Sequence, residues 1–359
     1  MLLFSSLLLL ITAISARKSL PSQYEASCFP KCNCNSTTVE CKDLHETDTA
    51  MFEKILPKIY PDLDTISITG NDFGDLPKEN IFGGRSRQLK VSLFDISDND
   101  IRSFASETFF GLPKVEFIYL RNNEIESVGS EPFSYTPAVR VIDLTAGLAA
   151  RLTPRKKASL IKDMLEAGHN FMHLQEVILS SNTLTELDPD TFCKVEGISR
   201  LVLTDNLFDN LNLNPACLRN LKLLDLRKNK IATVPAVIYN TLDLNTIDVS
   251  TNPINCECKS EEFIKFANDD STIFVNQQYT TCAAPAPLAG KTIFALEDAN
   301  LCQRGSSFFS WLILLLIAGG VLFIYRHLRR TGRLNRMGPI FGYSQLKAND
   351  EAATSPAFV

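Results

Sequence analysis

The 359-residue sequence lacks the short motifs that identify common enzyme classes. It contains no nucleophile elbow, no glycine-rich phosphate-binding loop and no HExxH zinc-protease pattern. Of its four histidines, only His169 and His173 have the spacing of helical metal ligands. Gly168 interrupts that helix and no carboxylate or cysteine spacing completes a ligand set, so we expect a surface or loop role for this pair. We predict that the chain is not an enzyme and binds no cofactor or metal.

A strong basic charge, which would indicate a nucleic-acid or heparin partner, is also absent. The formal net charge is −5, and residues 326–359 carry six Lys or Arg against two acidic residues, so the preceding chain sums to −9. This mild acidity keeps the surface soluble and argues against nucleic acid as a partner. The 34 residues of segment 326–359 are too few to hold a kinase or another folded signalling domain.

The chain opens with the apolar run MLLFSSLLLLITAIS, which ends in small residues. A basic n-region is missing, but an apolar run with small residues at its end is typical of a secretory signal peptide. We therefore assign residues 1–16 to a signal peptide that directs the chain out of the cytoplasm.

A second apolar run covers residues 306–325, and the 18 residues from Phe308 to Tyr325 carry no charge. This length is sufficient for one helix to cross a lipid bilayer. A cluster of arginines with one histidine follows directly, and such clusters stay on the cytoplasmic side, where they can meet anionic lipid. We predict a single-pass type I protein of the cell membrane, with its ectodomain outside and residues 326–359 as a cytoplasmic tail.

Between these runs, the pattern apolar-x-x-apolar-x-apolar-x-x-Asn-x-apolar returns eight times within residues 61–254. Its Asn position falls at Asn71, Asn99, Asn123, Gly147, Asn182, Asn206, Asn229 and Asn252. Units of this size cannot enclose a core alone and must stack, which predicts an α/β leucine-rich repeat solenoid with a curved parallel sheet on its concave face. The Asn amides should satisfy backbone groups where the chain leaves each strand.

The ten cysteines form two groups of four and one pair. The groups are Cys28, Cys32, Cys34 and Cys41 before the repeats, and Cys256, Cys258, Cys282 and Cys302 after them. In a secreted chain they indicate disulfide-bonded caps, which we place at residues 28–60 and 255–302, because a solenoid must cover the apolar edges of its end units. Spacing alone leaves three pairings open in each cap.

These groups, together with the run Asn252-Pro253-x-x-Cys256-x-Cys258, resemble the cysteine-rich caps of the extracellular leucine-rich repeat family. The resemblance implies the disulfides Cys28–Cys34, Cys32–Cys41, Cys256–Cys282 and Cys258–Cys302. The remaining pair, Cys193 and Cys217, occupies the same phase of adjacent repeats, so stacking should bring the two near disulfide range on the convex side. Two buried free thiols are the alternative.

The fourth repeat differs from the others, because Gly147 replaces the Asn and extra residues precede the next unit. Thr153 can cap a helix with Pro154 at its first position, and Ala158, Ile161 and Leu165 give that helix one apolar face. We predict a helical insertion at about residues 148–173, packed on its own repeat as a lengthened return segment. A contact surface for a partner is the alternative.

Function should then lie in the side chains that the strands present on the concave face. The phase of the repeats selects the candidate partner-binding residues Asp95, Phe117, Tyr119, Arg121, Asp143 and Arg227. Tyrosine and arginine are the residues most often found at binding hot spots. The alternative is that no partner binds there: tyrosine is common in strands, and exposed charged residues keep a surface soluble.

Three short signals add to this picture. Asn35-Ser36-Thr37 is a glycosylation sequon on the N-terminal cap. In the tail, Tyr343 and Leu346 have the spacing of a tyrosine-based sorting signal that an endocytic adaptor reads. Val359 could fill the pocket of a PDZ domain, with its carboxylate free.

The order of cap, repeats, interruption, repeats, cap, span and short basic tail is most similar to the trophoblast glycoprotein family. That resemblance implies a cell-surface receptor or co-receptor that binds an extracellular protein and modulates signalling, with Wnt inhibition and cell migration as the family's associations. Ile254 stands where the family commonly has Trp, and no partner-binding residue carries over. The alternatives are an auxiliary ion-channel subunit, acting through its span and basic juxtamembrane cluster, and homophilic adhesion.

Overall fold

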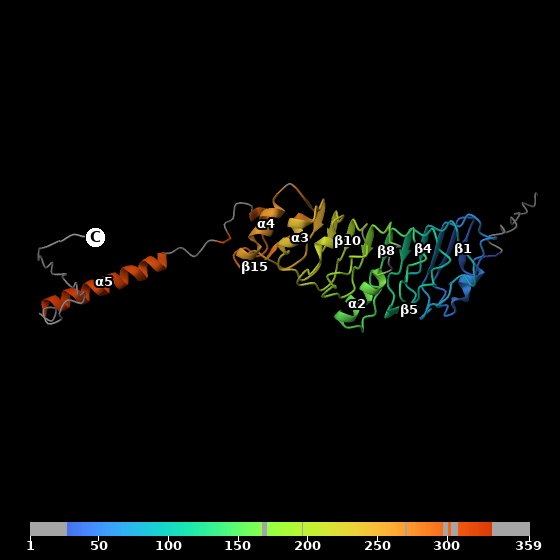
Figure 1. Ribbon diagram of the computed structural model, residues 1–359, viewed down its shortest axis with the longest axis horizontal. Coiled ribbons are helices and arrows are strands. Elements are labelled where there is room, and N and C mark those ends of the chain that lie inside the picture. The colour runs from blue at the N-terminus through green and yellow to red at the C-terminus, as the bar shows by residue number, and fades with distance from the viewer. Residues whose placement is uncertain are drawn as a thin grey trace, which may run out of the picture. The chain divides into compact units, whose positions relative to one another are not determined.

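The repeats form one stacked sheet in the computed structural model, which describes residues 27–166, 171–195, 197–269, 271–296, 301–302 and 308–331. Its eleven strands, in spatial order, are β1 (Cys32–Cys34), β2 (Thr38–Lys42), β3 (Thr65–Thr69), β4 (Leu93–Asp95), β6 (Phe117–Tyr119), β8 (Val141–Asp143), β9 (Glu176–Ile178), β10 (Arg200–Val202), β11 (Leu223–Asp225), β12 (Thr246–Asp248) and β14 (Ile273–Phe274). Neighbouring strands pair in parallel, except β1 and β2, which are antiparallel. Figure 1 shows these strands side by side along the unit. The predicted leucine-rich repeat solenoid is confirmed.

The other elements lie on the return segments and in the C-terminal cap. Two small parallel pairs join β5 (Ser103–Phe104) to β7 (Ser127–Val128) and β13 (Ile254–Asn255) to β15 (Cys282–Ala284). The α-helices in the described residues of this unit are α2 (Pro154–Leu165), α3 (Ala236–Thr241) and α4 (Glu261–Ala267), and the 3₁₀ turns are η1 (Thr49–Lys54), η3 (Pro215–Cys217), η4 (Cys258–Ser260), η5 (Gln277–Tyr279) and η6 (Ile293–Leu296).

An asparagine ladder links the repeats where the chain turns out of each strand. Asn206 is a buried rung: its Oδ1 accepts hydrogen bonds from the backbone N of Asn182 and of Leu184, each at 3.0 Å. Its Nδ2 donates to the carbonyl oxygens of Leu179 and Leu203 at 2.9 and 3.0 Å. The amide thus satisfies backbone groups of two adjacent repeats, which confirms the role predicted for this position.

Gly147 interrupts the ladder. Its backbone carbonyl accepts a hydrogen bond from the backbone N of Ile125 at 2.9 Å, where other repeats use a side-chain amide. A Cβ atom on Gly147 would lie 2.8 Å from the carbonyl oxygen of Leu120 and 3.0 Å from that of Leu144. The backbones of the third and fourth repeats therefore approach more closely than an asparagine would permit.

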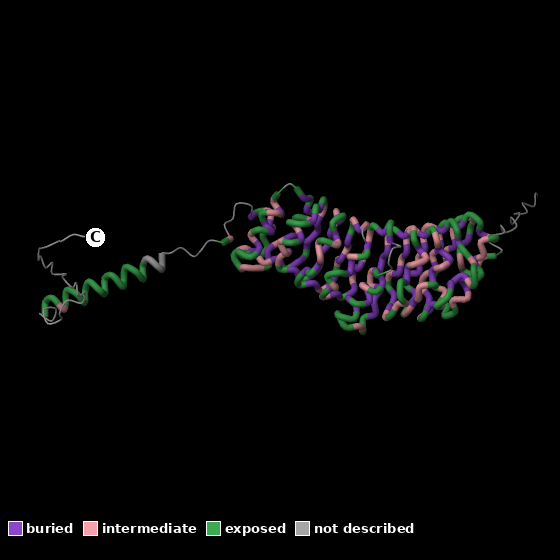
Figure 2. Tube along the Cα trace, viewed as in Figure 1, coloured by how far each residue is buried: buried purple, intermediate pink, exposed green. Residues whose placement is uncertain are grey.

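A column of phenylalanine rings fills the core of the first five repeats. Phe94 contacts Phe109, Phe109 stacks on Phe133, and Phe133 contacts Phe171, with centroid distances of 6.1, 5.7 and 6.0 Å. Ring pairs of this geometry contribute roughly 0.5–1.5 kcal/mol each beyond the area that they bury. Figure 2 shows buried residues along the whole length of the repeat unit, so the core is continuous.

Helix α2 occupies the insertion in the fourth repeat, where the sequence predicts a helix. The side chain of Thr153 caps its first turn, and the expected apolar face is buried. Lys157 is buried with that face, and its Nζ donates to the carbonyl oxygen of Asn182 at 2.8 Å and to Oγ1 of Thr183 at 2.7 Å. Burial lowers the pKa of Lys157, and its two hydrogen bonds tie the helix to the turn of the next repeat.

Five disulfides crosslink the repeat unit. They are Cys28–Cys34, Cys32–Cys41, Cys193–Cys217, Cys256–Cys282 and Cys258–Cys302. Each cap therefore holds two disulfides in the pairing that the family resemblance implies, and the remaining bond joins two adjacent repeats.

A second unit, from Gln303 to Val359, contains α5 (Phe308–Arg330). Among the described residues, this is the one helix long and apolar enough to cross a membrane. Its large apolar side chains from Leu312 to Tyr325 are 48–73% exposed, and its last turn carries His327, Arg329 and Arg330. The signal peptide predicted at residues 1–16 lies outside the described residues.

Candidate functional site

The concave residues of the third repeat, on β6, lie beside those of β4 and β8. Parallel register sets Asp95, Tyr119 and Asp143 side by side in one row. A second row, toward the amino ends of the same strands, consists of Leu93, Phe117 and Val141. We call Phe117, Tyr119 and Arg121 the platform, because these three half-buried side chains come from one strand and the turn that follows it.

Arg121 is held in place by two neighbours. Its Nε donates to Oδ2 of Asp143 at 2.6 Å, and its guanidinium carbon lies 4.2 Å from the ring centroid of Tyr119. Burial lowers the pKa of Arg121, but the hydrogen bond and charge of Asp143 outweigh it, so the pKa lies above its usual value. The side chain is 40% exposed, and within the described part of the chain its two Nη groups have no acceptor. They can therefore meet a carboxylate or carbonyl of a partner.

Asp143 is buried, which corrects the prediction that it is an exposed binding residue. It is 4% exposed, and its Oδ1 accepts from the backbone N and from Oγ1 of Thr145 at 2.9 and 2.6 Å. Asp95, Asp225 and Asp248 accept a hydrogen bond from the backbone N two residues on in the same way. This hydrogen bond forms an Asx turn, so these aspartates shape the strand ends. Asp143 therefore positions Arg121 and does not offer an exposed carboxylate of its own.

Arg227 does not join the platform. Its Nη2 lies 3.1 Å from Oδ2 of Asp225, and its Nε donates to Oγ1 of Thr204 at 3.3 Å. It follows β11, whereas the platform lies on β6, with β8, β9 and β10 between them. At about 4.8 Å per strand, the two arginines are separated by roughly 19 Å along the sheet. The concave candidates therefore divide into two places rather than one.

Stability should fall as pH rises through the pKa of Asp225. Burial raises the pKa of this carboxyl above its ordinary value of 3.8, although the backbone N–H and charge of Arg227 oppose the shift. The folded state then holds the proton more tightly than the unfolded state, so the free energy of unfolding decreases with pH above 3.8 until the folded group ionises. Asp225→Asn should remove this slope and Arg227→Gln should steepen it. Pulse proteolysis in urea between about pH 4 and pH 7 measures both, and equal slopes in wild type and Asp225→Asn would contradict the assignment.

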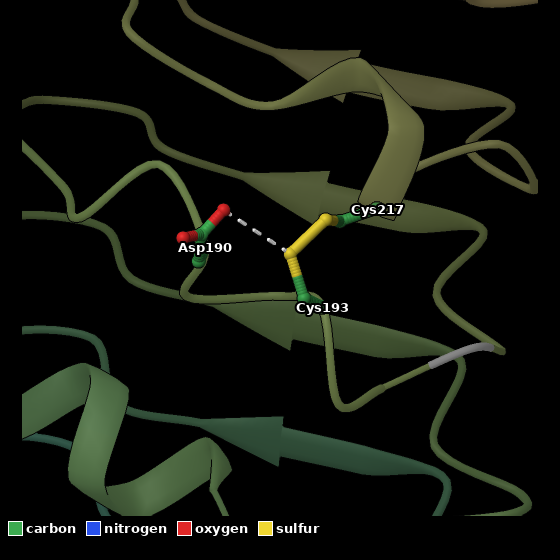
Figure 3. Close-up of side chains that lie close together, drawn as sticks. All are labelled: Asp190, Cys193 and Cys217. Carbon is green, nitrogen blue, oxygen red and sulfur yellow. Dashed lines mark hydrogen bonds between the residues drawn. A yellow bond between two sulfur atoms is a disulfide. The ribbon is translucent and has the colours of Figure 1, made fainter.

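Within the described residues, two groups of side chains have the composition of metal sites but contain disulfides. Asp190, Cys193 and Cys217 offer ligand atoms within 4.8 Å of one another (Figure 3). The two sulfurs are bonded to each other, so neither is a thiolate that could bind a metal. Oδ1 of Asp190 lies 3.5 Å from Sγ of Cys193, which is a contact and not a hydrogen bond, because an oxidised sulfur carries no proton. The second group consists of Cys258, Glu261 and Cys302 and contains another disulfide.

The remaining predicted residues stay predictions. Asn35 is exposed, and its Oδ1 accepts from the backbone N of Thr37 at 2.8 Å. His169 and the tail residues Tyr343, Leu346 and Val359 lie outside the described residues.

Comparison with known proteins agrees with this geometry. A family model described as leucine rich repeat matches residues 172–231. The chain contains leucine-rich repeats. It is 27% identical over 85 residues to a phospholipase A2 inhibitor of Gloydius brevicaudus siniticus, 25% over 267 residues to mouse Toll-like receptor 9, and 24% over 156 residues to mouse CD180 antigen.

These alignments cover 24%, 72% and 42% of this leucine-rich repeat protein, but only 26%, 22% and 23% of the relatives, so the chain spans about a quarter of their length. Among solved structures, human trophoblast glycoprotein (Wnt-activated inhibitory factor 1) superimposes with a TM-score of 0.65 at 19% identity, covering 76% of this chain and 98% of that chain. The predicted similarity to trophoblast glycoprotein is confirmed at the level of the fold.

Proposed function

We propose that this leucine-rich repeat protein is a cell-surface receptor or co-receptor that binds an extracellular protein at the platform. The observation that carries the proposal is Arg121, which Asp143 and Tyr119 hold in one orientation while its Nη groups stay available. A pre-oriented arginine over the ring of Tyr119 loses little conformational entropy on binding, and such residues dominate binding energies at interfaces. Toll-like receptor 9, which the chain resembles in sequence, is a receptor by name.

Binding of the partner should weaken when the two aromatic rings of the platform are removed. Phe117→Ala with Tyr119→Ala should weaken capture by about 30-fold or more, because both rings would leave a rigid contact surface. Proximity labelling around the full chain on living cells identifies proteins near wild type, and a binding measurement with the strongest of them gives the fold-change. Val202→Ala with Leu223→Ala, on β10 and β11 of the same face, is the matched control.

The control separates this proposal from its rivals. Equal loss in both double variants would show that the partner does not contact the platform. If partners persist in both variants and vanish only when residues 308–330 are replaced by an unrelated span, the protein acts through its membrane segment, as an auxiliary channel subunit would. Enrichment of the chain itself would indicate homophilic adhesion.

The topology that fits this function is type I, with the repeat unit outside, α5 in the membrane and the tail inside. A chain that ends after Cys302 should then be secreted as a soluble folded protein with five disulfides. Thiol labelling under denaturing conditions should find no free cysteine, and mobility on a gel should change upon reduction. Retention in the cell, or recovery only as reducible aggregates, would contradict the cap assignment.

We extend the proposal to signalling, with the Wnt pathway as the first candidate. The support is the similarity in fold to a protein whose name includes Wnt-activated inhibitory factor. A Wnt-responsive reporter should fall when the full chain is expressed, and Phe117→Ala with Tyr119→Ala should restore it. A reporter that responds equally to both proteins would remove Wnt signalling from the proposal.

A further inference from the structure

A groove lies at the amino ends of β4, β6, β8 and β9, next to the platform. It encloses about 560 Å³. Its polar lining consists of Lys90, Ser92, Lys114, Glu116, Arg140, His173 and Gln175. Each of four consecutive repeats contributes to it, because these residues occupy the positions just before each strand.

The groove is basic on a chain whose formal net charge is −5. Lys90, Lys114 and Arg140 face a single lining carboxylate, Glu116. Lys90 also reaches the exposed Asp62 at 2.5 Å, and Arg140 lies 3.4 Å from Glu116. Lys114 is exposed and has no ion pair within the described residues. Exposed ion pairs of this kind are weak, so the cations can exchange their present contacts for those of a ligand.

Apolar side chains accompany these charges. Leu89, in the first repeat of the groove, is 64% exposed, and Met172, which precedes His173 in the last, is 79% exposed. Leu89 lines the groove, whereas Met172 adjoins the lining residue His173 in sequence. The other exposed large aliphatic side chains described in the repeat unit, Val237, Ile273 and Val275, lie in or next to α3 and β14, so the exposed leucine in this basic groove indicates a contact surface.

The groove continues into the platform. Ser92, Glu116 and Arg140 each immediately precede the first residue of β4, β6 or β8. Four strands span three gaps of about 4.8 Å, so an extended peptide of roughly five residues crosses the groove at right angles to the strands.

We propose that the groove binds an acidic, extended segment of the partner protein, in which carboxylates alternate with apolar residues. The carboxylates meet Lys90, Lys114 and Arg140, and the apolar side chains lie against Leu89 and Ala138. This inference rests on the proposed function, since the same partner would contact the platform with an adjoining part of its surface.

The probe is a fluorescein-labelled peptide of alternating glutamate and leucine, and its control has glutamine in place of each glutamate. Fluorescence anisotropy with the full chain in neutral detergent should show at least about tenfold tighter binding of the acidic peptide, and salt should weaken it. Lys114→Glu with Arg140→Glu should weaken binding about tenfold or more. Lys194→Glu with Lys230→Glu, two exposed lysines of later repeats, should change it less than about twofold.

Equal binding of the two peptides, or equal weakening by the two double variants, would overturn the proposal. So would displacement of the acidic peptide by heparin at far lower concentration than by unlabelled peptide, because the groove would then be a polysaccharide site. Circular dichroism and the count of free thiols verify that each variant is folded. If Phe117→Ala with Tyr119→Ala abolishes capture of the cellular partner while Lys114→Glu with Arg140→Glu leaves it intact, the proposed function stands and the role of the groove fails.

Discussion

Asn206→Leu should lower the free energy of unfolding by about 3–5 kcal/mol. Leucine has the same branching at Cγ, but it removes the acceptor for the backbone N of Asn182 and Leu184 and one donor to each of the carbonyl oxygens of Leu179 and Leu203. Each buried backbone group left without a partner costs roughly 1–3 kcal/mol. Because adjacent repeats share these hydrogen bonds, the loss falls on the interface between two repeats.

Pulse proteolysis in urea measures this loss, and hydrogen exchange at the amides of Asn182 and Leu184 locates it. Asn245→Ala is the control, because its exposed side chain does not take part in the ladder, and it should change stability by less than about 0.5 kcal/mol. If hydrogen exchange at both amides is unchanged in Asn206→Leu, these backbone groups form other hydrogen bonds in the variant. The asparagine ladder would then not be what stabilises the stacked repeats.

Gly147→Asn should destabilise the protein by about 2–3 kcal/mol, although it restores the residue that every other repeat has. The reason is steric, since the new Cβ would lie 2.8 Å from the carbonyl oxygen of Leu120 and 3.0 Å from that of Leu144, and both are backbone atoms. Gly147→Ala introduces the same Cβ and should have an effect of the same sign. Urea unfolding followed by pulse proteolysis compares the two variants with wild type.

Gly74→Asn is the matched control for this substitution. Its backbone has a φ of +63°, which asparagine tolerates, and a Cβ there would meet no atom within 4 Å. Its effect should stay below about 1 kcal/mol. An increase in stability with Gly147→Asn would mean that the fourth repeat can relax to accept an amide rung, and the close approach of the two backbones would then not be required for folding.

The fold could be predicted from the sequence because its determinants are local or repeated. Asn123, Asn182, Asn206, Asn229 and Asn252 each donate to one carbonyl oxygen of the preceding repeat and to one of their own repeat, so the requirement recurs in phase along the chain. The first turn of α2 was predictable from Thr153 and Pro154, since capping depends on neighbouring residues alone. The pairing within each cap came from the family resemblance, because spacing does not select among the possible disulfides.

The binding surface was only partly predictable. Strand alternation tells which face a side chain occupies, but exposure depends on the size of its neighbours. Tyr119 and Asp143 share a row, yet Asp143 is buried where Arg121 reaches over it. The sequence does contain a signal for the Asx turns. The segments DIS, DLT, DLR and DVS each begin with the aspartate that ends a strand.

Two other features needed three-dimensional neighbours. Lys157 adjoins the apolar face of its helix, and only the turn of the next repeat supplies its acceptors. The basic groove is assembled from single residues of four repeats, separated in sequence by whole turns of the solenoid, so no window of sequence contains it.

The crosslinks have a mechanical consequence in the proposed topology. A partner that pulls on the platform transmits tension to the membrane anchor through the later repeats and the C-terminal cap. Cys193–Cys217 closes a loop with a separation of 24 residues, and Cys258–Cys302 closes one with a separation of 44 residues. Force bypasses the chain inside each loop, so roughly 200 Å of contour length cannot be drawn out while the sulfurs stay bonded, at about 3.3 Å per residue. The later repeats and the C-terminal cap, which connect the bound partner to the membrane, therefore resist elongation under force.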